Sequence, residues 1–440
     1  MEAICTETPD REHDHKSRPY SPFLTRRFDL ALQFASGLHF EEERKGTGTP
    51  YLAHLISVCA LVLEAGGDED QAVAALLHSA VEKHGGLATL NTIQRLFGQR
   101  VAKALQFRSN STATDRRKKQ DWRGKKKKYL EHLRNANRDA LLVAAADKLH
   151  DARAMHSDAQ KMGEKSWGRF KAPKEDQLWV YEETIKILQK RRAARTLVDG
   201  LRRVLPELRS ATRESKSLES CNQKVQPYRP FLTRRFDLAL QVASGLHSAQ
   251  RRKGTSVPYI AHLLAVCGLV LEFGGDEDEA IAALLHDAVE DQGGIPTLVT
   301  IRRLFGDRVA EAVESCSDST ASDPEKKLPW RHRKQKYLDH LQHAGKDTLI
   351  VAIADKLHNA RAVLSDYCQM GEALWKRFNA PKEDQLWFYD ALVKTLQTTM
   401  APSALVCELE EVIDELSSEC RNPYSSKYSG TKINERKPRC

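Results

Sequence analysis

The chain repeats itself once, at a constant offset of 208 residues. The segment FLTRRFDLALQFASGLHF begins at Phe23 and FLTRRFDLALQVASGLHS begins at Phe231, so the two segments differ at only two of eighteen positions. The same offset continues without a gap as far as Trp179 and Trp387. Because solenoid repeats are only about 20–50 residues long, each copy is long enough to be a whole domain. The repeat therefore predicts two similar domains in tandem.

These matches set the expected domain bounds. We predict a first domain over residues 18–200 and a second over residues 226–408. The polar stretch 210–226 is expected to connect them. Residues 1–17 and 421–440 are expected to be disordered tails, because they are too polar to bury a core.

Within each copy, hydrophobic residues recur at helical spacing. In the second copy, PYIAHLLAVCGLVLEFG begins with proline and ends with glycine, and DEDEAIAALLHDAVEDQGG carries acids in its first turn and a glycine pair behind it. No convincing series of alternating strands occurs. The pattern predicts an all-α protein of two helical bundles. It also predicts that His286 and Glu290 stack on one face of a continuous helix.

Composition narrows the functional class. Hydrophobic residues make up 41% of the 440 residues, no apolar run is long enough to span a membrane, and the polar N-terminus lacks the core of a signal peptide. We therefore expect a soluble, cytoplasmic protein without a membrane partner. The net charge is +9, but no zinc knuckle or aromatic-rich basic motif accompanies it, which argues against nucleic-acid binding. The nine cysteines form no CxxC pair, which argues against a disulfide scaffold or zinc ribbon.

Four polar residues of the second copy interrupt or end apolar runs: His262, His286, Asp287 and Asp355. A lone histidine on an apolar face is usually a satisfied core residue, and a lone acid is usually a helix or ion-pair contact. The four together, in the order H…HD…D, are far more specific, because buried charges need partners and a divalent ion supplies them. Two imidazoles and two carboxylates suit manganese, iron or zinc.

The local sequences around these residues extend the pattern. In the second copy they are QRRKGTSVPYIAHLLAV, AALLHDAVEDQGG, LFGDRVAEAVESCSD and VAIADKLHNAR. Over about residues 235–395 the copy resembles the HD-domain phosphohydrolases, specifically the alarmone (ppGpp) hydrolase branch of RelA/SpoT-type proteins and their small single-domain relatives. One departure is Leu263, where that family usually has proline after the first metal-binding histidine.

The resemblance implies roles for individual residues of this chain. It implies metal ligands at His262, His286, Asp287 and Asp355, with Mn²⁺ as the cofactor. It implies that Glu290 and Asp291 handle the hydrolytic water, that Arg252 and Lys253 contact the nucleotide, and that Asn359 lies near the sugar or base. As a loop pair, Arg252 and Lys253 could instead be merely solvated, and Asn359 could be a plain helix-surface residue.

The first copy lacks two of the acidic residues that the expected chemistry requires. It keeps His54, His78 and Asp147, but Ser79 replaces the ligand acid and Lys83 replaces the second acid of the pair. From Tyr51 to Glu82, twenty-four of thirty-two positions still match the second copy. We therefore interpret the first copy as a pseudoenzyme domain that packs on the second, or as a drifting duplicate without a role.

The resemblance favours removal of the 3′-pyrophosphate from the guanosine nucleotides ppGpp or pppGpp by the second copy, with one tightly bound ion per chain. The alternatives are an HD phosphohydrolase for another nucleotide and a non-catalytic alarmone-binding or interaction module. Synthesis of the alarmone is not expected, since the two copies and the tails account for the chain.

Overall fold

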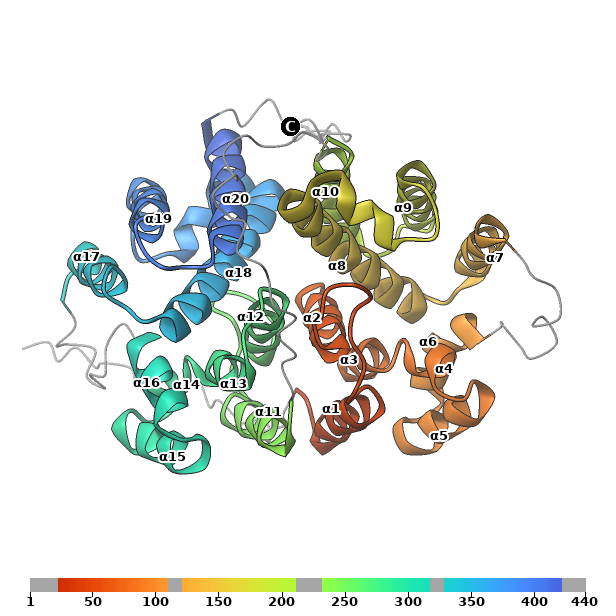
Figure 1. Ribbon diagram of the computed structural model, residues 1–440, viewed down its shortest axis with the longest axis horizontal. Coiled ribbons are helices and arrows are strands. Elements are labelled where there is room, and N and C mark those ends of the chain that lie inside the picture. Colours follow the sequence, from red (N-terminus) through yellow and green to blue (C-terminus); the bar gives the residue numbers. More distant parts are fainter. Residues whose placement is uncertain (1–22, 110–120, 211–231, 317–327, 422–440) are drawn as a thin grey trace, which may run out of the picture.

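The computed structural model describes residues 23–109, 121–210, 232–316 and 328–421. Within these ranges the chain is helical, and the only extended pairings are two isolated bridges, Glu43 with Pro50 and Arg251 with Pro258 (Figure 1). The prediction of an all-α protein is confirmed. None of the described helices is long and apolar enough to cross a membrane. The predicted tail 1–17 lies outside the described residues, as do nearly all of the connector 210–226 and the tail 421–440.

The two halves have the same order of helices. The first half contains α1 (Arg26–Leu38), α2 (Tyr51–Glu64), α3 (Glu69–Leu76), α4 (Ala80–Lys83), α5 (Leu87–Phe97), α6 (Gln99–Ser109), α7 (Trp122–Asn135), α8 (Arg138–Met162), a 3₁₀ helix (Gly163–Arg169), α9 (Lys174–Lys190) and α10 (Arg195–Ser210). The second contains α11 (Arg234–Leu246), α12 (Ile260–Glu272), α13 (Glu277–Leu285), α14 (Ala288–Asp291), α15 (Ile295–Phe305), α16 (Asp307–Cys316), α17 (Trp330–Leu341), α18 (Lys346–Met370), a 3₁₀ helix (Gly371–Arg377), α19 (Lys382–Leu396) and α20 (Ser403–Arg421).

Local signals explain where α13 begins. The Asp276 side chain accepts from the backbone N–H of Glu279, and the Glu279 side chain accepts from the backbone N–H of Asp276, which forms a capping box. Gly275 precedes this cap because a Cβ there would lie 2.4 Å from Val270 Cγ1 and 2.8 Å from the Val270 carbonyl oxygen. These contacts hold α13 against α12 and fix the direction in which its far end points.

The predicted continuous third helix is divided in the structure. α13 ends at Leu285 and α14 begins at Ala288, so His286 and Asp287 lie in a turn between them. The prediction that His286 and Glu290 stack on one unbroken helix was therefore wrong. The first half breaks at the same place although it has Ser79 there. The turn is therefore a feature of the fold and does not depend on Asp287. A break of two residues leaves the helical spacing of the hydrophobic residues almost unchanged, so the sequence pattern does not reveal it.

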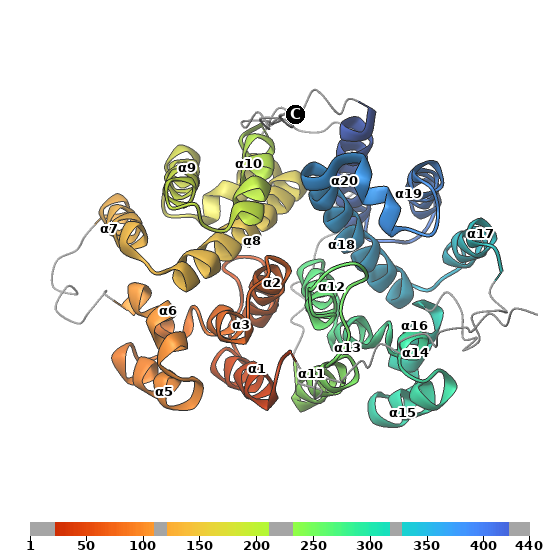
Figure 2. The same cartoon turned by 180° about the vertical axis from the view of Figure 1, so that it is seen from behind.

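A last helix in each half was missed by the sequence pattern. α10 packs on α8, and α20 packs on α18, so each covers the longest helix of its own half. α10 ends at Ser210 and α20 at Arg421, beyond the domain ends predicted at 200 and 408. These helices close the bundle on the side that faces away from α3 and α13 (Figures 1 and 2).

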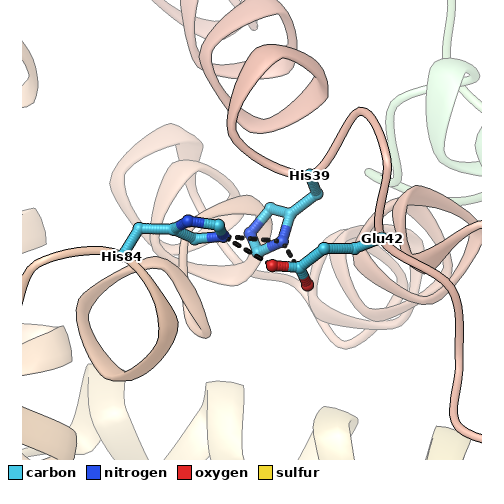
Figure 3. A group of neighbouring side chains, drawn as sticks. All are labelled: His39, Glu42 and His84. Atoms are coloured by element: carbon cyan, nitrogen blue, oxygen red, sulfur yellow. Dashed lines mark hydrogen bonds and ion pairs between the residues drawn. The ribbon is translucent and has the colours of Figure 1, made fainter.

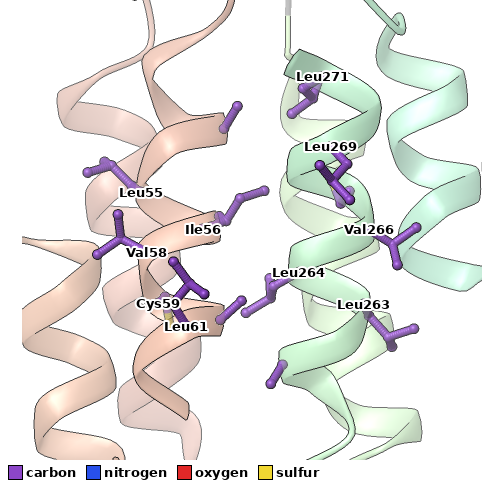
Figure 4. Close-up of a cluster of buried hydrophobic side chains, with 14 of the residues drawn as sticks. Leu55, Ile56, Val58, Cys59, Leu61, Leu263, Leu264, Val266, Leu269 and Leu271 are labelled. Carbon is purple, nitrogen blue, oxygen red and sulfur yellow. The ribbon is translucent and has the colours of Figure 1, made fainter. Parts of the chain in front are cut away.

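The two halves lie side by side, with α2 packed along α12 and α1 along α11 (Figures 1 and 2). Both α2 and α12 are apolar on nearly every face, which suits helices buried on all sides. Figure 4 shows their facing side chains, with Ile56 and Leu264 in the space between them. Both of these residues are fully buried. The apolar runs that each copy carries thus form one core that continues through both halves.

Gly268 lies where α12 approaches α2 closely. A Cβ at this position would lie 2.1 Å from Ser57 Oγ and 3.4 Å from the Ala53 carbonyl oxygen. We expect Gly268→Val to destabilise the protein by about 1–3 kcal/mol, because extra carbon atoms would force the two helices apart. Thermal unfolding measures this. The control is Gly245→Ala on α11, where nothing lies within 4 Å and alanine should be neutral or slightly stabilising. Equal melting temperatures for the two variants would contradict the close packing.

Candidate metal centre

The four predicted ligands of the second copy meet at one place in the core. His262 comes from α12, His286 and Asp287 from the turn between α13 and α14, and Asp355 from α18. His262 Nε2 lies 3.2 Å from Asp355 Oδ1 and 3.6 Å from Asp287 Oδ2. His286 Nε2 lies 3.0 Å from Asp287 Oδ2 and 3.8 Å from Asp355 Oδ1. Two nitrogen and two oxygen donors therefore face one another.

Surrounding contacts orient these donors. His286 Nδ1 lies 2.9 Å from the carbonyl oxygen of Ala283, so Nδ1 carries the proton and the Nε2 lone pair faces the carboxylates. Asp287 Oδ2 accepts from the Tyr259 hydroxyl at 2.6 Å, and Asp355 Oδ1 accepts from Asn359 Nδ2 at 2.5 Å. The Tyr259 contact could not be predicted from the sequence, because a tyrosine at the start of an apolar helix is usually a core residue.

The donor set fits a divalent cation. His286 Nε2 is buried and, within the described residues, makes no hydrogen bond of good geometry, although Asp287 is close. Burial alone would lower the pKa of His286, but Asp287 and Asp355 raise it to about 9. Burial would likewise raise the pKa of Asp355, yet the Lys356 ammonium and the two histidines hold it well below its usual range. A buried cluster of this kind favours positive charge at its centre.

The predicted substrate residues divide into two groups. Arg252 lies beside the centre: its Nη2 donates to Asn359 Oδ1 at 2.6 Å, and its Nη1 lies 3.1 Å from His358 Nδ1. Lys253 is exposed, and its Nζ donates to Asn379 Oδ1 at 2.9 Å. Arg252 and Asn359 are therefore brought together with the metal donors, whereas the exposed Lys253 side chain contacts Asn379.

Glu290 and Asp291 lie on α14, the short helix that directly follows the turn with His286 and Asp287. Both are exposed. Asp291 Oδ2 accepts from Gln250 Nε2 at 2.7 Å. The two residues therefore follow the turn that carries His286 and Asp287 directly in the chain, and their side chains are exposed to solvent.

The first copy still brings three donors together. His54 Nε2 and His78 Nε2 each lie 3.3 Å from Asp147 Oδ1, and the two nitrogens are 3.2 Å apart. In place of a fourth donor, Ser79 Oγ lies 3.3 Å from His39 Nε2. The first copy thus keeps three of the four candidate metal donors and lacks the second carboxylate.

The other replacements in the first copy form a network of their own. Lys83 Nζ donates to Glu42 Oε2 at 2.6 Å and lies 3.1 Å from the centroid of the Tyr51 ring. His39 Nδ1 and His84 Nε2 approach the same carboxylate at 3.0 and 2.8 Å, as Figure 3 shows. At the matching positions the second copy has Asp291, Gln250 and Gln292. Lys83 therefore pairs with Glu42, whereas the second copy has glutamine at the position of Glu42. The replacements at these three positions are thus mutually compatible.

Comparison with known proteins identifies the fold family. A family model described as HD domain matches residues 31–167 and 239–380, which together make up more than half of the chain. The chain belongs to the HD-domain family. Its first HD domain corresponds to the first copy, and its second HD domain carries the complete H…HD…D set.

Individual relatives match over part of their length. The guanosine-3′,5′-bis(diphosphate) 3′-pyrophosphohydrolase MESH1 of Xenopus tropicalis is 38% identical over 126 residues, which are 28% of this chain and 66% of that protein. The bifunctional (p)ppGpp synthase/hydrolase SpoT of Escherichia coli is 32% identical over 152 residues, which are 33% of this chain and 20% of that protein. The chain therefore spans just under two thirds of the first relative and a fifth of the second.

Two solved structures are also similar to part of the chain. A metazoan ortholog of SpoT that hydrolyses ppGpp is 24% identical, covers 42% of this chain and 96% of its own, and gives a TM-score of 0.34. A protein from Listeria monocytogenes is 26% identical, covers 36% of this chain and 99% of its own, and gives a TM-score of 0.31.

Proposed function

We propose that the second HD domain is a divalent-metal-dependent hydrolase that removes the 3′-pyrophosphate of guanosine 3′,5′-bis(diphosphate) or its pentaphosphate form. The observation that carries this proposal is the convergence of His262, His286, Asp287 and Asp355, in which each imidazole Nε2 lies 3.0–3.8 Å from an oxygen of both carboxylates and Arg252 lies beside them. The names of the relatives support the substrate class. Because this substrate is a cellular nucleotide, we propose that the protein acts in the cytoplasm.

Mn²⁺ is the ion that we propose for this centre. Mn²⁺ is a hard cation that favours oxygen donors, so the two carboxylates suit it, and the two imidazole nitrogens complete a mixed set that manganese, iron and zinc can all accept. A divalent ion bound there would make water nucleophilic near neutral pH and draw electron density from a phosphoryl oxygen.

The remaining roles belong to side chains at the mouth of the site. Glu290 and Asp291 orient the attacking water and accept its proton, since they are exposed on α14 next to the donors. Arg252 and Lys253 bind phosphate oxygens, and their positive charge stabilises the charge that grows on the phosphoryl group during the reaction. Asn359, which is held against Arg252, contacts the sugar or the base.

We further propose that the first HD domain has no turnover of its own and acts as the structural partner of the second. Three donors without Asp287's equivalent give a weaker site. Lys83, paired with Glu42, occupies the position of the second water-handling acid. The first domain shares a continuous core with the second. We therefore propose that it serves to pack against the second domain or to complete the second domain's site.

Product analysis tests the proposed function. We expect the full-length protein with Mn²⁺ to convert guanosine 3′,5′-bis(diphosphate) into guanosine 5′-diphosphate and pyrophosphate in equal amounts, and chelation of the metal to stop the reaction. Anion-exchange chromatography separates these products. Faster hydrolysis of another nucleotide in a panel would favour the alternative HD phosphohydrolase. Tight binding of the alarmone without any product would favour a binding module.

A further inference from the structure

A glutamate of the first HD domain reaches the metal centre of the second. Glu64 is the last residue of α2, and its Oε1 lies 2.5 Å from Nε2 of His358 on α18. The other nitrogen of that ring, His358 Nδ1, lies 2.8 Å from Nδ1 of His262. A chain of three side chains from two domains therefore ends on a candidate metal ligand.

Only one arrangement of protons satisfies this chain when His262 serves as a ligand. His262 Nε2 faces Asp355 and Asp287, so the proton of this ring must be on Nδ1. His358 Nδ1 then accepts that proton in a hydrogen bond, and His358 Nε2 carries the proton that it donates to Glu64. Arg252 Nη1 lies 3.1 Å from His358 Nδ1 and 3.3 Å from His262 Nδ1, so it shares the one lone pair of His358 Nδ1 with the His262 N–H.

The environment of His358 agrees with this assignment. The ring is buried, with Glu64 at one of its nitrogens and His262 at the other. A neutral imidazole has one donor and one acceptor, which is what the two neighbours require. Without an acceptor at the position of Glu64, the His358 ring would be free to turn or to change its tautomer, and His262 would lose its partner.

We propose that Glu64 of the first HD domain is a positioning residue for the metal centre of the second, acting through His358 on His262. This inference rests on the proposed function in that the centre must bind a divalent ion. Outer partners that orient a ligating histidine typically change metal affinity by about 10–100-fold. The proposal gives the first HD domain a defined role, because its Glu64 supplies the acceptor for His358 Nε2.

The repeat provides a matched control for this residue. Glu272, the last residue of α12, has its Oε1 2.7 Å from His150 Nε2, and His150 Nδ1 lies 2.8 Å from His54 Nδ1. The offset of 208 residues relates Glu272 to Glu64, His358 to His150 and His262 to His54. Glu272 therefore occupies the matching position in the opposite direction, toward the incomplete site, although His150 Nε2 makes no hydrogen bond of good geometry within the described residues.

The test compares Glu64→Ala with Glu272→Ala in the full-length protein. Both are made in a His78→Ala background, which removes a donor from the first domain's cluster, so that the second domain's site dominates the titration. Free Mn²⁺ is followed by electron paramagnetic resonance without nucleotide. We expect Glu64→Ala to weaken Mn²⁺ binding by about 10–100-fold and Glu272→Ala to change it by less than about threefold. Glu64→Gln, which keeps an acceptor oxygen, should restore most of the affinity.

Folding defects are separated from positioning by a second pair of variants. Glu64→Met and Glu272→Met keep the volume of the side chain and remove the acceptor, so they repeat the comparison if the alanine variants do not fold. Unchanged Mn²⁺ affinity in a folded Glu64 variant would overturn the proposal, and so would an equal loss in both members of a pair. A wild-type protein that binds Mn²⁺ but hydrolyses a different nucleotide would overturn the proposed function and leave this inference standing.

Discussion

Asp287→Ala should abolish measurable turnover. The residue supplies one of the two carboxylates of the candidate centre, with Oδ2 3.0 Å from His286 Nε2 and 3.6 Å from His262 Nε2. Loss of several kcal/mol of charge stabilisation corresponds to a decrease in kcat of at least about 10³-fold. Steady-state release of pyrophosphate measures the effect. Asp287→Asn keeps an acceptor for the Tyr259 hydroxyl and should be nearly as inactive, which separates the loss of charge from the loss of that contact.

Ser79→Ala is the matched control for this prediction, since Ser79 is the residue of the first HD domain that corresponds to Asp287. The serine hydroxyl contributes only a 3.3 Å contact to His39, so its removal should leave kcat nearly unchanged. If the two alanine variants lost activity equally, the assignment of catalysis to the second domain would be wrong.

Glu290→Gln should lower kcat by about 10²–10⁴-fold, the usual effect of replacing a group that transfers a proton. Metal content should stay near that of the wild type, because Glu290 is exposed on α14 and is not one of the four candidate ligands. Turnover and metal analysis on the same preparation measure both quantities.

Two other results would assign Glu290 differently. A Glu290→Gln variant that loses its metal would make this residue a ligand. An unchanged rate would mean that Glu290 and Asp291 merely end a short helix, with Asp291 held by Gln250 at the surface.

The sequence predicted the parts of the protein that depend on local pattern. The all-α class follows from hydrophobic periods and caps, of which the Asp276–Glu279 capping box is an example. The convergence of His262, His286, Asp287 and Asp355 could be expected because four polar residues in apolar surroundings need one another or a cation. Their roles as ligands stay a prediction that metal binding must test.

What the sequence did not predict depends on contacts between distant segments. The break at His286 and Asp287 leaves the spacing of the hydrophobic residues almost unchanged, so the pattern predicts a continuous helix there. Most of the helix Ser403–Arg421 lies beyond residue 408, where the matches between the two copies set the expected end of the second domain. Glu64 had no signal at all, because a glutamate that ends an apolar helix is usually solvated, and its partner His358 lies 294 residues away in the chain. His358 could have been noticed, since it follows Asp355 by three residues on the same helix.

The most direct test of the account is to locate Mn²⁺ by anomalous scattering at the manganese absorption edge in crystals of the full-length protein. The account predicts a strong peak between His262, His286, Asp287 and Asp355, with a weaker peak or none between the three donors of the first HD domain. A peak found only between His54, His78 and Asp147 would contradict it. So would the absence of a fully occupied site from both domains.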